Sequence, residues 1–302
     1  SQAIGTGGHD LHEEIGGISM LFGLNALAQD ENTHVIVLIS KPPARHVAEK
    51  ILRQAQTCGK PVVVNFLGAE PAELISFGIH SAETLADSAD IAVALSQGKN
   101  SASTHLALTQ SHLELLQQHA QHLSTTRKYI RGVFAGGTFC YESQLLCQKH
   151  GIFAYSNTPT HGNEKLNDIW RSNAHTLIDM GDDDFTRGRP HPMIDPTLRN
   201  QRIQAELDDP NCAVVLFDLV LGYGATMDPA QELLQLLNQR DPQNSPLLVA
   251  HVCGTEADPQ TRSLQINALH QSGVLIAECN AQAALWASQI ALIQAEKNGV
   301  TQ

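Results

Sequence analysis

The 302-residue sequence is poor in basic residues, in aromatic side chains and in long apolar runs. Its 19 Lys and Arg residues face 31 Asp and Glu residues, which gives a formal net charge of −12. This balance argues against a nucleic-acid partner, because phosphate-backbone binding depends on Lys and Arg that displace counterions. No apolar run reaches the ~18 residues that span a bilayer, and no signal peptide is recognisable. We therefore expect a cytoplasmic protein with neither a nucleic-acid nor a membrane partner.

Motifs for metal binding are also missing. The cysteines form no Cys-x-x-Cys pair, and no spacing of Cys and His is typical of a zinc site. His9 and His12 could supply two metal ligands, but no third is visible, so we expect no metal site. Apolar neighbours surround the cysteines, which predicts buried and reduced thiols. The six are Cys58, Cys140, Cys147, Cys212, Cys253 and Cys279.

Two stretches of the chain, 1–95 and 194–292, resemble each other. In each, three short apolar runs rich in β-branched residues alternate with helical patterns, which indicates strands buried on both faces of parallel sheets. We therefore predict an α/β protein with two open parallel-sheet domains. The corresponding runs are 34–39 and 213–217, then 60–64 and 245–250, then 77–79 and 273–277, and the predicted helices between them are 18–28, 44–57, 230–239 and 260–271.

The domain boundaries follow from the segment between the repeats. Apolar residues recur at helical spacing between Leu106 and Leu123, which predicts an amphipathic connecting helix within 101–128. The domains are then 1–100 and 129–302. The second adds a strand at 131–135, a helix at 139–150, and strands at 152–155 and 176–180. The chain begins without Met, at what looks like a strand-to-glycine-loop transition, so we expect that an N-terminal portion precedes it.

Ligands of open parallel sheets bind beyond the carboxyl ends of the strands, so the loops there are the candidate sites. Three loops are rich in glycine, which lets a backbone approach an anion at a helix start. Their candidate anion-binding residues are Gly7 and Gly8, then Gly136, Gly137 and Thr138, then Gly222, Gly224 and Thr226. Each loop could equally be a tight structural turn. None contains a Walker phosphate loop or a dinucleotide fingerprint.

The densest charged cluster lies at 181–196. Three prolines should stiffen this loop, and charged groups held in it need partners. Arginine forks bind carboxylate or phosphate in a bidentate way. Arg187, Arg189 and His191 are therefore the candidate catalytic residues, with Asp195 as a candidate substrate contact. The alternative is a structural Arg–Asp network at a domain seam.

These motifs resemble the FdrA-like branch of the succinyl-CoA synthetase superfamily. The resemblance spans nearly the whole chain, and its most specific motif runs from Gly181 to Thr197. The other motifs are Ile4-Gly5-Thr6-Gly7-Gly8-His9-Asp10-Leu11, Ile39-Ser40-Lys41-Pro42-Pro43 and Lys60-Pro61-Val62-Val63-Val64. The resemblance implies flavodoxin-like ligase domains, with 1–100 like the α subunit and 129–302 like the β subunit. It also implies an N-terminal Rossmann CoA-binding-type domain, which this chain lacks.

The chain departs from the superfamily pattern at one point that concerns mechanism. Succinyl-CoA synthetases carry a phosphorylated His in a Gly-His-Ala-Gly loop. Here Gly68-Ala69-Glu70-Pro71 leads almost directly to Phe77-Gly78-Ile79, and His80 lies outside such a loop. No ATP-grasp segment is visible either. No cofactor is therefore assigned to this chain, and CoA or a nucleotide would bind through the missing domain.

The FdrA-like branch is also linked to oxamate carbamoyltransferase, as one subunit of a multi-subunit enzyme. The resemblance then implies a small anionic substrate, an acyl phosphate such as carbamoyl phosphate, and partner subunits or a homo-oligomer. Amides at Gly136-Gly137-Thr138 and at Gly222-Tyr223-Gly224 would hold phosphate. Arg187, Arg189 and His191 would polarise the carbonyl or bind the amide substrate. An acyl-CoA synthetase subunit and a non-catalytic scaffold are the alternatives.

Overall fold

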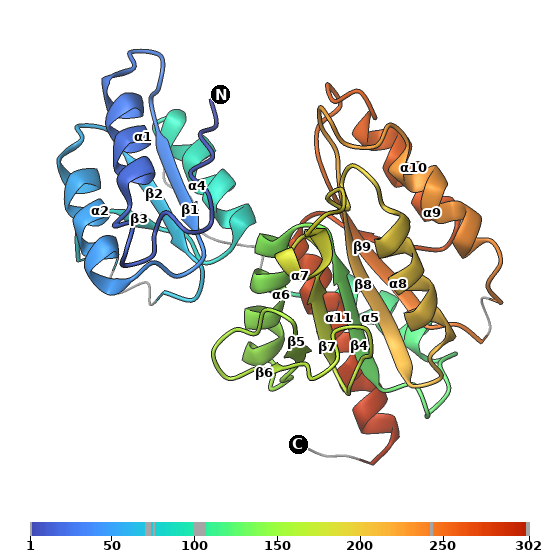
Figure 1. The fold of residues 1–302 in the computed structure, drawn as a ribbon. Coiled ribbons are helices and arrows are strands. Elements are labelled where there is room, and N and C mark those ends of the chain that lie inside the picture. Colours follow the sequence, from blue (N-terminus) through green and yellow to red (C-terminus); the bar gives the residue numbers. More distant parts are fainter. Residues whose placement is uncertain (1, 70–73, 75, 100–106, 242–243, 300–302) are drawn as a thin grey trace. The chain divides into compact units, whose positions relative to one another are not determined.

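The computed structural model describes residues 2–69, 74, 76–99, 107–241 and 244–299, and the chain divides into two units, 1–105 and 106–302 (Figure 1). In the first unit, three parallel strands form a sheet of order β1-β2-β3. The strands are β1 (Ile36–Ser40), β2 (Val62–Phe66) and β3 (His80–Ser81), and the helices are α1 (Ile18–Gln29), α2 (Arg45–Thr57) and α4 (Leu85–Ser96).

The core of the first unit lies between the sheet and the pair α1 and α2. On the other face α4 packs chiefly over β2, where Asn65 Nδ2 donates to Ser88 Oγ at 3.2 Å. Strand β1 is therefore only partly covered on this face, and Val37 and Ile39 are 36% and 43% exposed. The expectation that every strand is buried on both faces is wrong for β1, because α4 lies chiefly over its neighbour β2. Residues 2–17 contain no strand, so the expected strand before Gly5 is also wrong.

The second unit is a three-layer α/β/α arrangement around a seven-stranded parallel sheet of order β10-β9-β8-β4-β7-β5-β6 (Figure 1). Helices α5, α6 and α11 cover one face, and α8, α9 and α10 cover the other. The strands are β4 (Tyr129–Phe134), β5 (Tyr155–Ser156), β6 (Glu164–Lys165), β7 (Thr176–Asp179), β8 (Cys212–Val220), β9 (Leu247–Cys253) and β10 (Leu275–Ala277). The helices are α5 (Gln110–Ala120), α6 (Gly137–Lys149), α7 (Asp183–Thr186), α8 (Thr197–Asp208), α9 (Pro229–Leu237), α10 (Arg262–Gln271) and α11 (Asn280–Lys297).

Helix α5 is the helix expected as a connector. It packs on α11, where Gln294 Nε2 and Lys297 Nζ both donate to the carbonyl of Ala120, at 3.1 and 2.6 Å. Leu116 and Ala120 are fully buried in the same core as α6 and α11. This helix is therefore part of the second unit.

The repeat is visible in the sheets. Strands β1, β2 and β3 are parallel neighbours in chain order, and so are β8, β9 and β10. Three expectations are wrong in detail. The strand expected at 77–79 is instead β3 at His80–Ser81. The strand expected at 152–155 is reduced to β5, and the stiff loop expected at 181–196 contains the helical turn α7, which Asp182 caps by accepting from Asp184 N. No helix in the described part of the chain is long and apolar enough to cross a membrane.

The six cysteines are free, but they are not uniformly buried. Cys140, Cys147 and Cys212 lie in the core, whereas Cys58, Cys253 and Cys279 are partly exposed. Burial raises the pKa of Cys147 to about 11, so this thiol is inert at neutral pH.

Candidate functional site

Three neighbouring strands of the second unit, β7, β4 and β8, end at the same edge of the sheet. The loop after β4 is 135–136, the loop after β7 is 180–196, and the loop after β8 is 221–228. They contain most of the candidate residues predicted from sequence. The parallel order of the sheet thus brings the glycine loop before α6 next to the charged segment after β7.

Asp218 near the end of β8 organises this edge. Its Oδ1 accepts from Ala135 N and its Oδ2 from Gly136 N, both at 2.7 Å, and its side chain is fully buried. Arg199 Nη1 on α8 donates to the carbonyl of Asp218 at 3.0 Å. Burial raises the pKa of Asp218, against the opposing effects of Arg199 and the two amides. The amide of Gly136, expected to hold an external anion, is therefore occupied by a carboxylate of the chain.

Asp179 at the end of β7 approaches the same helix start. Its Oδ1 accepts from Gly181 N at 3.0 Å, and a Cβ on Gly137 would clash with its Oδ2. Two carboxylates therefore lie against the first turn of α6, where the positive end of the helix dipole favours negative charge. Gly137 is required here for space. Thr138 follows it in the first turn and is partly exposed.

His191 faces this cluster. Its Nδ1 accepts from Met193 N at 3.2 Å, so in the neutral imidazole the proton is on Nε2. That Nε2 is 2.6 Å from where a Cβ of Gly181 would stand, and a Cβ there would also meet the carbonyl of Ala135 at 2.7 Å. Burial lowers the pKa of His191, and the charge of Asp218 opposes this. The arrangement presents a neutral imidazole that can donate a hydrogen bond from Nε2.

The two candidate arginines lie on the exposed turn after α7. The side chain of Arg187 is 85% exposed and approaches Asp183 at 4.0 Å. Arg189 is exposed as well, and its backbone N donates to the carbonyl of Thr186 at 3.0 Å. Neither forms a hydrogen bond with His191 in the described part of the chain. An exposed ion pair of this kind adds little to stability, so the structure does not explain these arginines as a buried network.

The loop after β8 is held by Gln260. The amide of Gly222 donates to Gln260 Oε1 at 3.1 Å, and Gln260 Nε2 donates to the carbonyls of Gly222 and Thr226 at 2.9 and 3.1 Å. The hydroxyl of Thr226 donates to Glu232 Oε1 at 2.6 Å. The polar groups of Gly222 and Thr226 are thus hydrogen-bonded within the protein, whereas Gly224, the third candidate of this loop, is exposed. Because Thr226 N also donates to the carbonyl of Met193 at 2.9 Å, this loop is joined to the segment of His191.

Asp195 has a local structural role. It is exposed, and its Oδ1 accepts from Thr197 N at 3.0 Å at the start of α8. Hydrogen bonds from Thr197 lower the pKa of this carboxyl. The geometry does not bring Asp195 into contact with His191 through its side chain.

A family model for the CoA-ligase domain matches residues 133–290, which include all of this edge. The uncharacterized protein YahF of Escherichia coli (strain K12) is 40% identical over 295 residues, covering 96% of this chain and 56% of YahF. The chain belongs to the CoA-ligase family. Its resemblance to the succinyl-CoA synthetase superfamily, with the fold that this implies, is confirmed. The chain spans about half the length of this curated relative.

Two solved structures are similar to this chain at TM-scores below 0.5. The dinucleotide-forming acetyl-coenzyme A synthetase 1 of Ca. Korarchaeum cryptofilum, in complex with phosphate and ADP, is 14% identical, with 93% of this chain and 57% of that chain covered at a TM-score of 0.36. ATP citrate lyase from Methanothrix soehngenii, in complex with citrate and coenzyme A, is 11% identical, with 94% and 38% covered at 0.34.

The candidates Gly7 and Gly8 lie in the first unit, outside the CoA-ligase match. Asp10 occupies the helix start that they were expected to present, because its two carboxylate oxygens accept from Ser19 N and Met20 N at 2.8 and 2.9 Å. Both glycines are exposed, and a Cβ on either would meet nothing within 4 Å. Around them, His9 and His12 contact each other edge to face, but no group of three His, Cys, Asp or Glu residues suited to a metal occurs among the described residues.

Sequence reasoning missed His251 on β9. It lies in register with Asp218 and is 5% exposed. Its ring meets that of Phe139 on α6 edge to face, with the ring centroids 4.6 Å apart. Its Nδ1 has no hydrogen-bond partner among the described residues, and burial lowers its pKa to about 4. The available signal was a polar residue inside an apolar strand run, which also marks Asp218 in β8.

Proposed function

We propose that this CoA-ligase family member is a subunit of an enzyme that transfers an acyl group from an acyl phosphate, with carbamoyl transfer of the oxamate carbamoyltransferase kind as its reaction. The observation that carries the proposal is the fixed tautomer of His191 beside the start of α6. A neutral imidazole that donates from Nε2 can polarise a carbonyl, and it stabilises the oxygen on which negative charge develops.

The arginines would hold the leaving phosphate. Because Asp218 occupies the amides of Ala135 and Gly136, we place the phosphate toward the exposed side, where Arg187 and Arg189 can bind it in a bidentate way. In this reaction the amide nitrogen of oxamate attacks the carbonyl carbon of carbamoyl phosphate. The bond between that carbon and the bridging oxygen breaks, and the phosphate leaves with the proton lost by the nitrogen.

A second candidate is an acyl-CoA ligase subunit. The observation that favours it is the CoA-ligase match over 133–290. In that case CoA and a nucleotide would bind parts of the protein outside this chain. Either reaction would be completed by partner subunits or by further copies of the chain.

Phosphate release by the whole protein with its partner subunits separates these functions. Turnover of carbamoyl phosphate with oxamate in the absence of CoA supports the first, and turnover that requires CoA and a nucleotide supports the second. An intact assembly without turnover in either mixture indicates a non-catalytic scaffold and overturns both.

The role of His191 has its own test. His191→Ala should lower kcat by about 100-fold or more, as expected for loss of a donor to a developing oxyanion. His191→Gln retains an N–H donor and should recover part of that loss. His122→Ala, an exposed histidine before β4, is the matched control. Equal rates for His191→Ala and the control would remove His191 from the chemistry.

A further inference from the structure

Polar atoms from three segments of the carboxyl edge converge beside Gly181. From the position where a Cβ of Gly181 would stand, His191 Nε2 is 2.6 Å away, the carbonyl oxygen of Ala135 is 2.7 Å away and Asp179 Oδ1 is 3.3 Å away. Such distances are too short for a carbon atom but suit a hydrogen-bonded nitrogen or oxygen. A polar ligand atom placed slightly farther from Gly181 would therefore be within hydrogen-bond reach of the same three atoms.

The carbonyl of Ala135 is an open acceptor. Ala135 is 1% exposed, and no described residue donates a hydrogen bond to its carbonyl oxygen. The amide of Gly136 donates to Asp218 Oδ2 at 2.7 Å, and the carbonyl of the same trans peptide points the opposite way. Asp218 thus fixes this carbonyl on the side of Gly181. Because nearly all buried carbonyls are paired, a ligand or a water is needed to supply the donor.

His191 supplies a donor next to this acceptor. Its Nδ1 accepts from Met193 N, so Nε2 carries the proton, and Nε2 has no hydrogen bond to a described residue. A carboxylate or phosphate oxygen placed here would meet the carboxylate of Asp179 as a like charge, and an ammonium group would meet the N–H of His191. A neutral group that accepts through one atom and donates through the next fits both partners.

We propose that this space recognises the primary amide of a carbamoyl group, and that the carbonyl of Ala135 selects NH2 over CH3. The inference rests on the function proposed above, in which His191 polarises the carbonyl of carbamoyl phosphate. The amide oxygen accepts from His191 Nε2, and the amide nitrogen donates to the carbonyl of Ala135. An acetyl group would leave that carbonyl buried without a donor, and sites built for an N–H reject analogues that lack it. Gly181 keeps the space open.

The experiment compares two stable phosphonates that differ in this one group. Phosphonoacetamide ends in a primary amide, whereas phosphonoacetone has a methyl group in place of the NH2. Titrations followed in ¹H–¹⁵N spectra of the whole chain should show saturable binding of phosphonoacetamide, with shifts at Ala135 and Gly181. Phosphonoacetone should bind at least ~10-fold more weakly, because one hydrogen bond to a buried acceptor is lost. Equal affinity of the two compounds, or no saturable binding, would overturn the inference.

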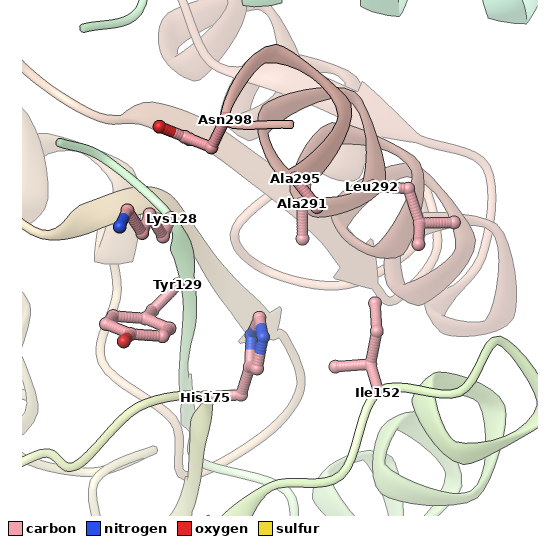
Figure 2. A pocket seen from close by; sticks show the side chains of 8 residues that line it. All are labelled: Lys128, Tyr129, Ile152, His175, Ala291, Leu292, Ala295 and Asn298. Carbon is pink, nitrogen blue, oxygen red and sulfur yellow. The ribbon is translucent and has the colours of Figure 1, made fainter. Parts of the chain in front are cut away.

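The same spectra show where the compound binds. The unit has another hollow, of about 170 Å³, where the start of β4 faces the last turns of α11 (Figure 2). It lies at the opposite edge of the sheet, and Ile152, Ala291 and Leu292 are among its lining residues. Shifts at these residues, with none at Ala135 or Gly181, would place the ligand in that hollow and contradict the proposed site.

Two substitutions test the space itself. Gly181→Ala places a methyl group where the three atoms converge and should weaken phosphonoacetamide at least ~10-fold. Gly5→Ala adds the same methyl group where nothing lies within 4 Å, and is the matched control. His191→Phe removes the donor that both compounds use, so their affinities should fall together and their ratio should remain. The site is wrong if a folded Gly181→Ala variant or, should that variant not fold, His191→Phe binds phosphonoacetamide as the native chain does.

Failure of amide selection can be told apart from failure of the proposed function. Turnover of carbamoyl phosphate with oxamate, together with equal binding of the two phosphonates, would remove the selection and leave the reaction. Selective binding of phosphonoacetamide without such turnover would support the amide site and remove the reaction.

Discussion

Buried polar side chains decide the character of the carboxyl edge in the second unit. Asp218, Asp179 and His251 are each at most 5% exposed, although no secondary-structure element needs a polar group at these positions. Burying such groups costs free energy unless they are hydrogen-bonded. Asp218 recovers this through hydrogen bonds from two amides, but the Nδ1 of His251 has no partner in the part of the chain that the structure describes. His251 is therefore a residue whose retention costs stability.

The pH dependence of unfolding should reveal His251. Its pKa is lowered from 6.5 to about 4 in the folded protein, so its contribution is fully present above pH 6.5 and is lost as the pH falls toward 4. Between pH 7 and pH 5 this amounts to about 2 kcal/mol. His251→Phe keeps the ring contact with Phe139 and cannot be protonated. Its free energy of unfolding should fall about 2 kcal/mol less than that of the native protein over this range.

Urea unfolding followed by the fluorescence of Trp170 and Trp286 measures this difference, since both tryptophans are in the second unit. His122→Phe, at an exposed position of the same unit, should follow the native protein. If His251→Phe and the native protein show the same pH dependence, His251 is charged or solvated in the fold.

At the residue scale, the sequence predicted part of the site. Gly136, Gly137 and His191 were identified because glycine at a strand-to-helix junction and a histidine among prolines are local signals. Asp218 and His251 were not, because an apolar strand run gives no indication of which polar member faces a helix start. Which amides of a glycine loop are available could not be predicted either, since that depends on strands far apart in sequence.

The starts of helices α1 and α6 differ from the anion-binding sites that were predicted from the sequence. Helix α1 begins after Gly17, and the carboxylate of Asp10 accepts from two amides of its first turn. Helix α6 is approached by Asp179 and Asp218. In both units an internal carboxylate takes the place that sequence reasoning gave to a ligand, because the same dipole and amides attract either anion.

Removal of the α1 carboxylate should loosen that helix alone. Asp10→Ala should reduce the stability of the first unit by about 1 kcal/mol, the usual cost of losing a helix cap. Hydrogen exchange at the amides of Ser19 and Met20 should quicken most, because they lose their acceptors. Glu31→Ala changes the same charge at an exposed position beyond the helix and should leave exchange unchanged. Equal protection in both variants would show that α1 does not depend on this cap.

Elements with a clear period were predicted well, and short ones were not. The helices α1, α2, α9 and α10 agree with their predicted ranges to within a few residues. The strands β5 and β6 have two residues each, too few for any periodicity. Helix α7 was hidden by the charged segment around it, and α8 follows Pro196 directly. In these places tertiary pairing, rather than local pattern, determines the structure.

At the scale of the whole molecule, the repeat explains why two units share one order of strands. In the first unit the three parallel strands stand alone in the described sheet, whereas in the second they are extended by β4, β7, β5 and β6. In this wider sheet β8 lies between β4 and β9, and α11 on one face and α8 on the other bury it more fully than β1. The second unit thereby acquires two core clusters, one on each face of its sheet, and each is made of its own residues.

A chain of residues 107–302 should therefore fold without the first unit. Both of its cores are complete, and a domain of about 200 residues buries enough surface to be stable. Because both tryptophans lie in this unit, fluorescence in the native chain reports the same transition. The m-value in urea scales with the surface exposed on unfolding, so the two chains should agree within about 15%. Loss of a cooperative transition in the shorter chain would mean that the first unit is needed to complete this fold.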